Sequence, residues 1–141
     1  MRGFTLVEIA VTIGIFSVII AITAPVALDS YLNYLLTAEM RNIVSLIRRA
    51  ENLSLANDGY ASHGISFQSN RYVIFRGNSY ATRNITFDEI YPRTEIINIT
   101  GGTEIVFLPI SGMPNSTITL SLNNNLQTQN ISINEQGTIS W

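Results

Sequence analysis

A run of twenty uncharged residues near the start of the chain, residues 9–28, constrains its fold more than any other feature. Eleven of the twenty are Ile, Val, Leu or Phe. As an α-helix the run is about 30 Å long, which matches the hydrocarbon thickness of a bilayer. The sequence therefore predicts a helix that can cross a membrane.

One carboxylate, Glu8, directly precedes this run. A carboxylate costs about 2.5–3.5 kcal/mol at mid-membrane and less near the end of a span. The eleven large apolar side chains contribute roughly 3 to 7 kcal/mol to insertion before the polar residues subtract from it. Insertion is therefore favourable by a small margin, and the segment can leave the bilayer if another apolar surface covers it.

Two simple interpretations of the segment fit less well. A cleaved signal peptide has a shorter apolar region, and here Pro25 directly follows the small residues at which cleavage would occur. An ordinary single-span anchor leaves both Glu8 and the Gly3-Phe4 junction unexplained.

The stretch Gly3-Phe4-Thr5-Leu6-Val7-Glu8, followed by the apolar run, resembles the processing site of type IV pilins and type II secretion pseudopilins. In that family a membrane peptidase cuts after the glycine and methylates the new amino terminus. The resemblance implies a leader of residues 1–3, cleavage between Gly3 and Phe4, and N-methylation of Phe4. The leader is short for the family, although Arg2 supplies the cytoplasmic positive charge that orients the span.

The resemblance also implies a role for Glu8 in assembly. After cleavage, Phe4 carries a free or methylated ammonium, and Glu8 of one subunit can pair with that ammonium of its neighbour. A buried charge without a partner costs far more than a paired one. The pairing would therefore favour an incoming subunit in the correct axial register.

The N-terminal helix is expected to have two parts: a transmembrane and assembly helix over residues 4–28, and an amphipathic helix over residues 29–57. Gly14 and Pro25 are the expected kink points, because proline removes a backbone donor and glycine weakens the helix. The helix is expected to end near Asn57-Asp58-Gly59. Apolar residues at steps of four and three form one stripe along the second part: Leu32, Leu36, Met40, Ile43, Ile47 and Ala50. The charged residues Glu39, Arg41, Arg48 and Glu51 lie off this stripe.

Residues 58–141 are expected to form a β-rich globular head, which makes the chain α+β: a long helix packed on a small antiparallel β-sheet head. Alternating apolar and polar residues favour strands with one face buried. A hairpin turn is expected at Ser69-Asn70. The predicted strands cover residues 64–67, 71–75, 85–87, 95–97, 104–107, 117–122, 131–133 and 138–141.

The head resembles the GspH/FimT group of pseudopilins and minor pilins. The similar segments are Ile105-Val106-Phe107-Leu108-Pro109 with Gly112, Ile118-Thr119-Leu120, and Ile131-Ser132-Ile133 with Gly137. A cysteine-free major pilin with a divergent head is the alternative.

The sequence contains no sign of catalysis, metal binding or a cofactor. It has no cysteine, which excludes disulfides, thiolate metal sites and cysteine nucleophiles. His63 is the only histidine and is expected to be solvated or to cap a helix. No phosphate-binding loop, nucleophile elbow or zinc-ligand spacing is present.

Two functions remain open at this stage. The first is a structural subunit whose partners are like or related subunits, the prepilin peptidase and, before assembly, the inner membrane. Its head would be extracytoplasmic and its filament extracellular or periplasmic. The second is a filament-tip binding module such as a DNA receptor for natural transformation. Residues 94–141 contain three acids and no base, so only one cluster could contact DNA, and weakly: Arg71, Arg76, Arg83 and Arg93.

Overall fold

The computed structural model describes residues 3–141 and consists of one long helix followed by eight short strands. The helix, α1, spans Leu6–Leu55 and is about 75 Å long at 1.5 Å per residue. Two short 3-10 helices follow it, η1 (Asp58–Tyr60) and η2 (Ile85–Phe87). The strands are β1 (His63–Phe67), β2 (Arg71–Arg76), β3 (Glu89–Pro92), β4 (Asn98–Gly101), β5 (Glu104–Phe107), β6 (Ile118–Asn123), β7 (Thr128–Ile133) and β8 (Ile139–Ser140).

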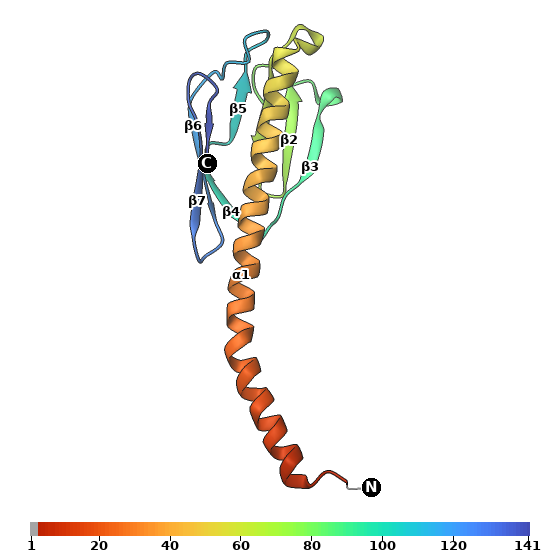
Figure 1. The fold of residues 1–141 in the computed structure, drawn as a ribbon. Helices are drawn as coiled ribbons and strands as arrows, with labels where there is room; N and C mark the ends of the chain where they lie inside the picture. Colours follow the sequence, from red (N-terminus) through yellow and green to blue (C-terminus); the bar gives the residue numbers. More distant parts are fainter. Residues whose placement is uncertain (1–2) are drawn as a thin grey trace.

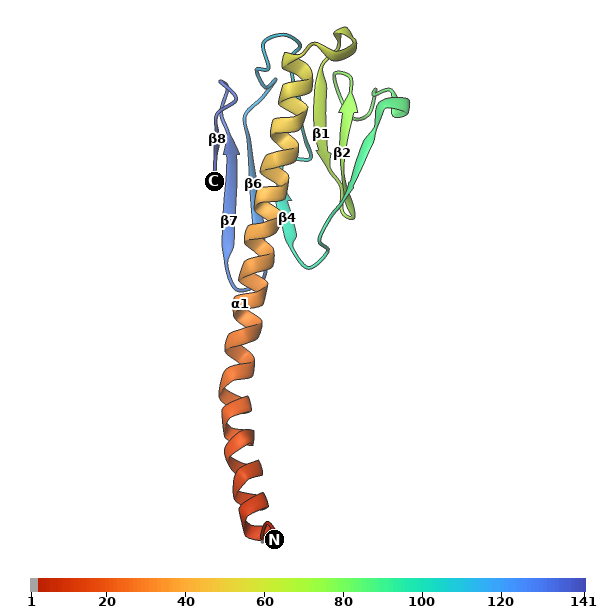
Figure 2. The same cartoon turned by 45° about the vertical axis from the view of Figure 1, so that its right-hand side comes forward.

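The strands form two antiparallel sheets, both of which lie against the C-terminal half of α1 (Figure 1). One sheet has the order β3-β2-β1-β5 and the other the order β4-β6-β7-β8. Figures 1 and 2 show α1 in front of both sheets, with its N-terminal half extending alone beyond the head. The predicted α+β fold is confirmed, and the head contains two small sheets instead of one.

The helix α1 is continuous through Gly14 and Pro25. Figure 1 shows a gentle curve over its N-terminal half, without a break in the ribbon. Its C-terminal end agrees with the sequence prediction. Ala56 is the C-cap, and the next residue, Asn57, adopts a left-handed conformation with φ 52°. Asparagine tolerates that conformation better than most residues, so it can terminate the helix there.

Two predicted strands are wrong. Residues 85–87 form η2, because the Asn84 side chain accepts a hydrogen bond from the Thr86 amide and starts a helical turn. Residues 95–97 form a turn, which is closed by the bond from the Ile97 amide to the Thr94 carbonyl. The strands that occur instead, β3 and β4, flank that turn. The predicted hairpin between β1 and β2 is confirmed, with Phe67 opposite Tyr72.

The core lies between the C-terminal half of α1 and the two sheets. The predicted stripe is buried from Leu36 onward, and Leu32 is half-buried. The buried face is broader than one stripe, because the helix contacts a sheet on each side. Val44 and Leu46 are buried for this reason.

Glu39 is buried within this core, although the sequence analysis placed it off the apolar stripe. It follows Leu36 by three residues and precedes Ile43 by four, so it lies on the same helix face as the stripe. Its carboxylate accepts hydrogen bonds from the Tyr72 hydroxyl, the Thr94 amide (3.3 Å) and the Thr94 hydroxyl (2.8 Å). These bonds satisfy the buried charge and attach α1 to the sheet that contains β2.

We predict that Tyr72→Phe destabilises the head by about 1.5–3 kcal/mol, because the buried carboxylate of Glu39 loses one of its donors. Urea unfolding of the full chain in detergent, followed by Trp141 fluorescence or near-UV circular dichroism, measures this loss. Tyr91→Phe is the matched control. Tyr91 donates to the half-exposed Glu89, where water can replace the lost bond. Equal losses in the two variants would contradict the role assigned to Glu39.

Candidate functional site

The N-terminal half of α1 has no contact with the head. Its large apolar side chains are all exposed, for example Leu6, Ile15 and Phe16. An 18-residue window in this helix has a mean hydropathy of 2.4 and none of it is buried. Burying one such side chain completely is worth about 1.5–3 kcal/mol, so the thirteen of them between Leu6 and Leu28 strongly favour any apolar cover. The helix is long and apolar enough to span a membrane.

Glu8 and Thr5 form a reciprocal cap at the start of α1. The Thr5 hydroxyl accepts a hydrogen bond from the Glu8 amide (3.2 Å). The Glu8 carboxylate accepts bonds from the Thr5 amide and the Thr5 hydroxyl, both at 2.9 Å and both through Oε2. This capping role was not among the sequence predictions, although Thr5-x-x-Glu8 matches the capping-box pattern.

The Gly3-Phe4 peptide bond lies immediately before this cap. Gly3 and Phe4 are exposed and precede the first helical residue. A Cβ atom added to Gly3 would meet no atom within 4 Å. The bond therefore lies in an exposed segment outside the helix, which a peptidase needs for access. Met1 and Arg2 of the expected leader lie outside the described residues.

The structure does not bring the four candidate DNA-contacting arginines together. Arg71 and Arg76 begin and end β2 and are about 17 Å apart along the strand at 3.4 Å per residue. Arg93 lies near the first end, since it binds the Gln68 carbonyl of the β1–β2 turn. Arg83 lies near the other end, since the next residue bonds to the Arg76 carbonyl.

Three of these arginines also have partners within the head. Arg76 pairs with Asp58 at 2.7 Å, and its guanidinium stacks on Phe87 at 3.8 Å. Arg83 pairs with Asp88 at 2.9 Å. Arg93 donates to two backbone carbonyls, those of residues 68 and 97. Of the four, Arg71 is exposed and the other three are half-buried.

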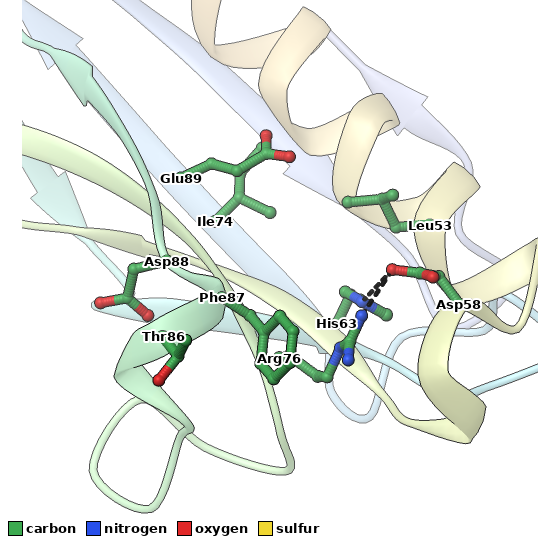
Figure 3. Close-up of a pocket in the computed structure, with 9 residues that line it drawn as sticks. All are labelled: Leu53, Asp58, His63, Ile74, Arg76, Thr86, Phe87, Asp88 and Glu89. Atoms are coloured by element: carbon green, nitrogen blue, oxygen red, sulfur yellow. Dashed lines mark hydrogen bonds and ion pairs between the residues drawn. The ribbon is translucent and has the colours of Figure 1, made fainter.

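The surface contains one shallow pocket of about 270 Å³ with several charged groups (Figure 3). It lies between the end of α1, η1, the first residue of β1, and the η2–β3 segment. In Figure 3 the side chains of Asp58, His63 and Arg76 converge. Its lining residues are Leu53, Asp58, His63, Ile74, Arg76, Thr86, Phe87, Asp88 and Glu89.

His63 is buried in this pocket, so the expectation of a solvated or capping histidine is wrong. Its side chain is 4% exposed, and Nε2 lies 3.7 Å from the Asp58 carboxylate. Burial and the positive charge of Arg76 lower the pKa of His63, and they outweigh Asp58, which acts in the opposite direction. His63 is therefore a neutral core residue at pH 7.

The carboxylates around the pocket are engaged in ion pairs with arginines. Arg49 of α1 binds Glu89 through two bonds of 2.6 and 2.8 Å, and this contact lowers the pKa of Glu89. Within residues 3–141, no group of three or more histidine and acidic side chains is arranged to hold a metal ion. The pocket contacts join β2 to η1 and η2 through Arg76, and α1 to β3 through Arg49 and Glu89.

No protein-family model matches the chain, and the searches of curated proteins and of solved structures found no match.

We predict that acidification destabilises the head through His63. The pKa is lower in the folded chain than in the unfolded chain, where it is near 6.5, so the unfolded chain binds more protons between these two values. The stabilising effect of a neutral His63 is complete above about pH 7 and decreases as the pH falls through this window, by at most about 1.4 kcal/mol per pH unit.

The measurement is urea unfolding of the parent and His63→Gln between pH 7.5 and 5. The variant should be less stable at pH 7.5 and should lose less stability as the pH falls. Parallel pH profiles for the two proteins would show that His63 does not titrate in this way.

Proposed function

We propose that this chain is a structural subunit of a filament of the type IV pilus or type II secretion pseudopilus class. The subunit would wait in the cytoplasmic membrane with its head on the outer side. After cleavage between Gly3 and Phe4 it would polymerise through α1 into an extracellular or periplasmic filament. The observation that carries the proposal is the bare apolar half of α1, which extends from a folded head and has one carboxylate at its start.

Two apolar environments can cover the bare half of α1. Lipid covers it before assembly, and the corresponding helices of neighbouring subunits cover it afterwards. Transfer between them is feasible because both environments are apolar and because Glu8 reduces the gain from lipid. An anchor that never left the membrane would be more stable without Glu8.

The capping box adds a second reason for a glutamate at this position. In the free chain the Thr5 amide and hydroxyl already bind Glu8. Both bonds reach Oε2, and within residues 3–141 the other oxygen, Oε1, accepts no hydrogen bond. The carboxylate can therefore keep its cap and still accept the ammonium of Phe4 from a neighbouring subunit. Its negative charge strengthens the cap but is required only for the second interaction, because an uncharged glutamine can also form the capping box.

We predict that three substitutions separate capping from pairing. Glu8→Gln keeps a side chain that can cap the helix but loses the charge. Thr5→Ala loses the cap but keeps the charge. Glu8→Ala loses both. If Glu8 pairs with the neighbour's ammonium, Glu8→Gln and Glu8→Ala should both abolish filaments, whereas Thr5→Ala should assemble.

The measurement is the yield of sheared filaments, compared with the amount of each variant in the membrane fraction. All three variants should be cleaved after Gly3 and should insert at least as well as the parent. Their heads should fold normally, because the first helix residue bonded to the head, Asn33, is roughly 37 Å away along α1. If Glu8→Gln forms filaments and Thr5→Ala does not, Glu8 acts only as a helix cap and the proposed pairing is refuted.

A further inference from the structure

The end of the head farthest from the bare half of α1 has a cluster of exposed apolar side chains, which we call the tip patch. Figures 1 and 2 show η1 and the loop between β5 and β6 side by side at this end. The Ile110 amide binds the Ser54 carbonyl at 2.9 Å, and a Cβ on Gly112 would contact Leu55. The tip patch consists of Leu55, Tyr60, Leu108, Ile110 and Met113.

Two residues of the tip patch have costly backbone conformations. Tyr60 is 91% exposed at φ 55°, and Ile110 is 72% exposed at φ 67°. A left-handed conformation is unusual for any residue other than glycine and is a real outlier for a β-branched one such as isoleucine. Glycine or asparagine would fit both positions at lower cost in water. Strain of this kind is often found at binding surfaces, so the two side chains are candidates for a contact.

The opposite end of the head carries a second set of exposed apolar side chains, which we call the base patch. It includes the turn between β6 and β7, which is attached to α1 by the bond from Asn124 to Asn33 (3.1 Å). It also includes the turn between β3 and β4, which is attached through Thr94 and Glu39. The base patch consists of Tyr31, Tyr34, Ile96 and Leu126.

We propose that the tip patch of one copy of this chain binds the base patch of the next copy along the filament. This inference rests on the proposed polymerisation. Subunits that place their bare helices in one common layer must all have the same orientation. A tip can then meet only a base. Because the contact joins two different surfaces, it can repeat from one copy to the next without forming a closed ring. The repeated contact would form a line of heads along the filament.

The charges at the two ends favour the same pairing. Glu51 on α1 and Glu135 in the turn between β7 and β8 are both near the tip; a Cβ on Gly137 of that turn would lie 3.5 Å from the Glu51 carboxylate. At the base, Arg41 and Arg71 are exposed and Arg93 is half-buried, against two exposed acids, Asp29 and Glu95. At the tip the acids Glu51, Glu135 and Asp58 outnumber the arginines Arg48 and Arg76. A tip with a net negative charge and a base with a net positive charge attract each other, whereas two tips repel.

The lengths along α1 are also compatible with this contact. The head covers the helix from Asn33 to Ser54, a distance of roughly 32 Å at 1.5 Å per residue. A second copy stacked tip to base is therefore displaced by about one head length. Its bare half, roughly 39 Å long, then lies beside the part of the first α1 that bears the head. In Figures 1 and 2 that part of α1 has no element over its front face. Its exposed side chains include Arg41, Ser45 and Arg48, so the apolar cover of the bare half comes from the bare halves of other copies.

Because the chain has no cysteine, paired cysteine substitutions test the contact directly. Filaments of the double variants Ile110→Cys/Ile96→Cys and Ile110→Cys/Leu126→Cys are treated with a short thiol-specific cross-linker and separated on a denaturing gel. At least one of them should give a ladder of dimers, trimers and larger species. Each single variant should remain monomeric. Co-assembled single variants, Ile110→Cys with the matching base variant, should stop at dimers.

Ile110→Cys/Ile90→Cys is the matched control. Ile90 is an exposed isoleucine in the middle of β3, away from both ends, and should give no ladder. A second measurement uses Ile110→Asn, which suits the left-handed conformation but removes the apolar side chain. Its filaments should dissociate at lower temperature or lower detergent concentration than those of the parent, whereas Ile90→Asn filaments should behave like the parent.

Two results together would overturn the tip-to-base contact and leave polymerisation intact. The first is that neither double cysteine variant gives a ladder, and the second is that Ile110→Asn filaments are as stable as those of the parent. Dimers from the Ile110→Cys variant alone would indicate a tip-to-tip contact and would also overturn it. Failure of the parent chain to form filaments would refute the proposed function, and the contact with it.

Discussion

The apolar half of α1 cannot remain in water, and this constraint links every part of the account. Its exposed Ile, Val, Leu and Phe side chains would be stabilised by any apolar cover, at about 1.5–3 kcal/mol for each one fully buried. The head does not provide that cover, because the sheets reach only as far as Asn33. Lipid and other copies of the helix are the two covers that fit its length and composition. A filament subunit uses both of them in succession.

The head is joined to this helix by polar contacts as well as by its core. Glu39 connects the lower part of the head to α1, and Ser54 connects the upper part through bonds from the His63 amide and to the Phe107 carbonyl. Arg49 adds a bidentate ion pair to Glu89 of β3. These contacts fix the head along about 22 Å of helix, from Glu39 to Ser54. An axial displacement of α1 is therefore transmitted to the tip and the base, so the helix register and the contact between heads depend on each other.

Local patterns predicted much of this structure, and long-range contacts account for the rest. The helix, its C-terminal end, most of the apolar stripe and the β1–β2 hairpin follow from periodicity and turn residues. The capping box was also readable from Thr5-x-x-Glu8. By contrast, the burial of Glu39 depends on Thr94, which is 55 residues away, and the environment of Glu89 depends on Arg49, which is 40 residues away. The partners of Arg76 and Arg83, and the burial of His63, likewise require the folded head. No single-sequence pattern encodes such pairings.

The most direct test of the central claim is the intact mass of the chain recovered in sheared, detergent-free filaments. The account predicts that the chain sediments as filaments, and that its mass corresponds to residues 4–141 with one added methyl group on Phe4. A chain that stays with the membrane until detergent releases it, or that begins at Pro25 or Leu28, would contradict the account. The first result would indicate an ordinary anchor, and the second a cleaved signal peptide.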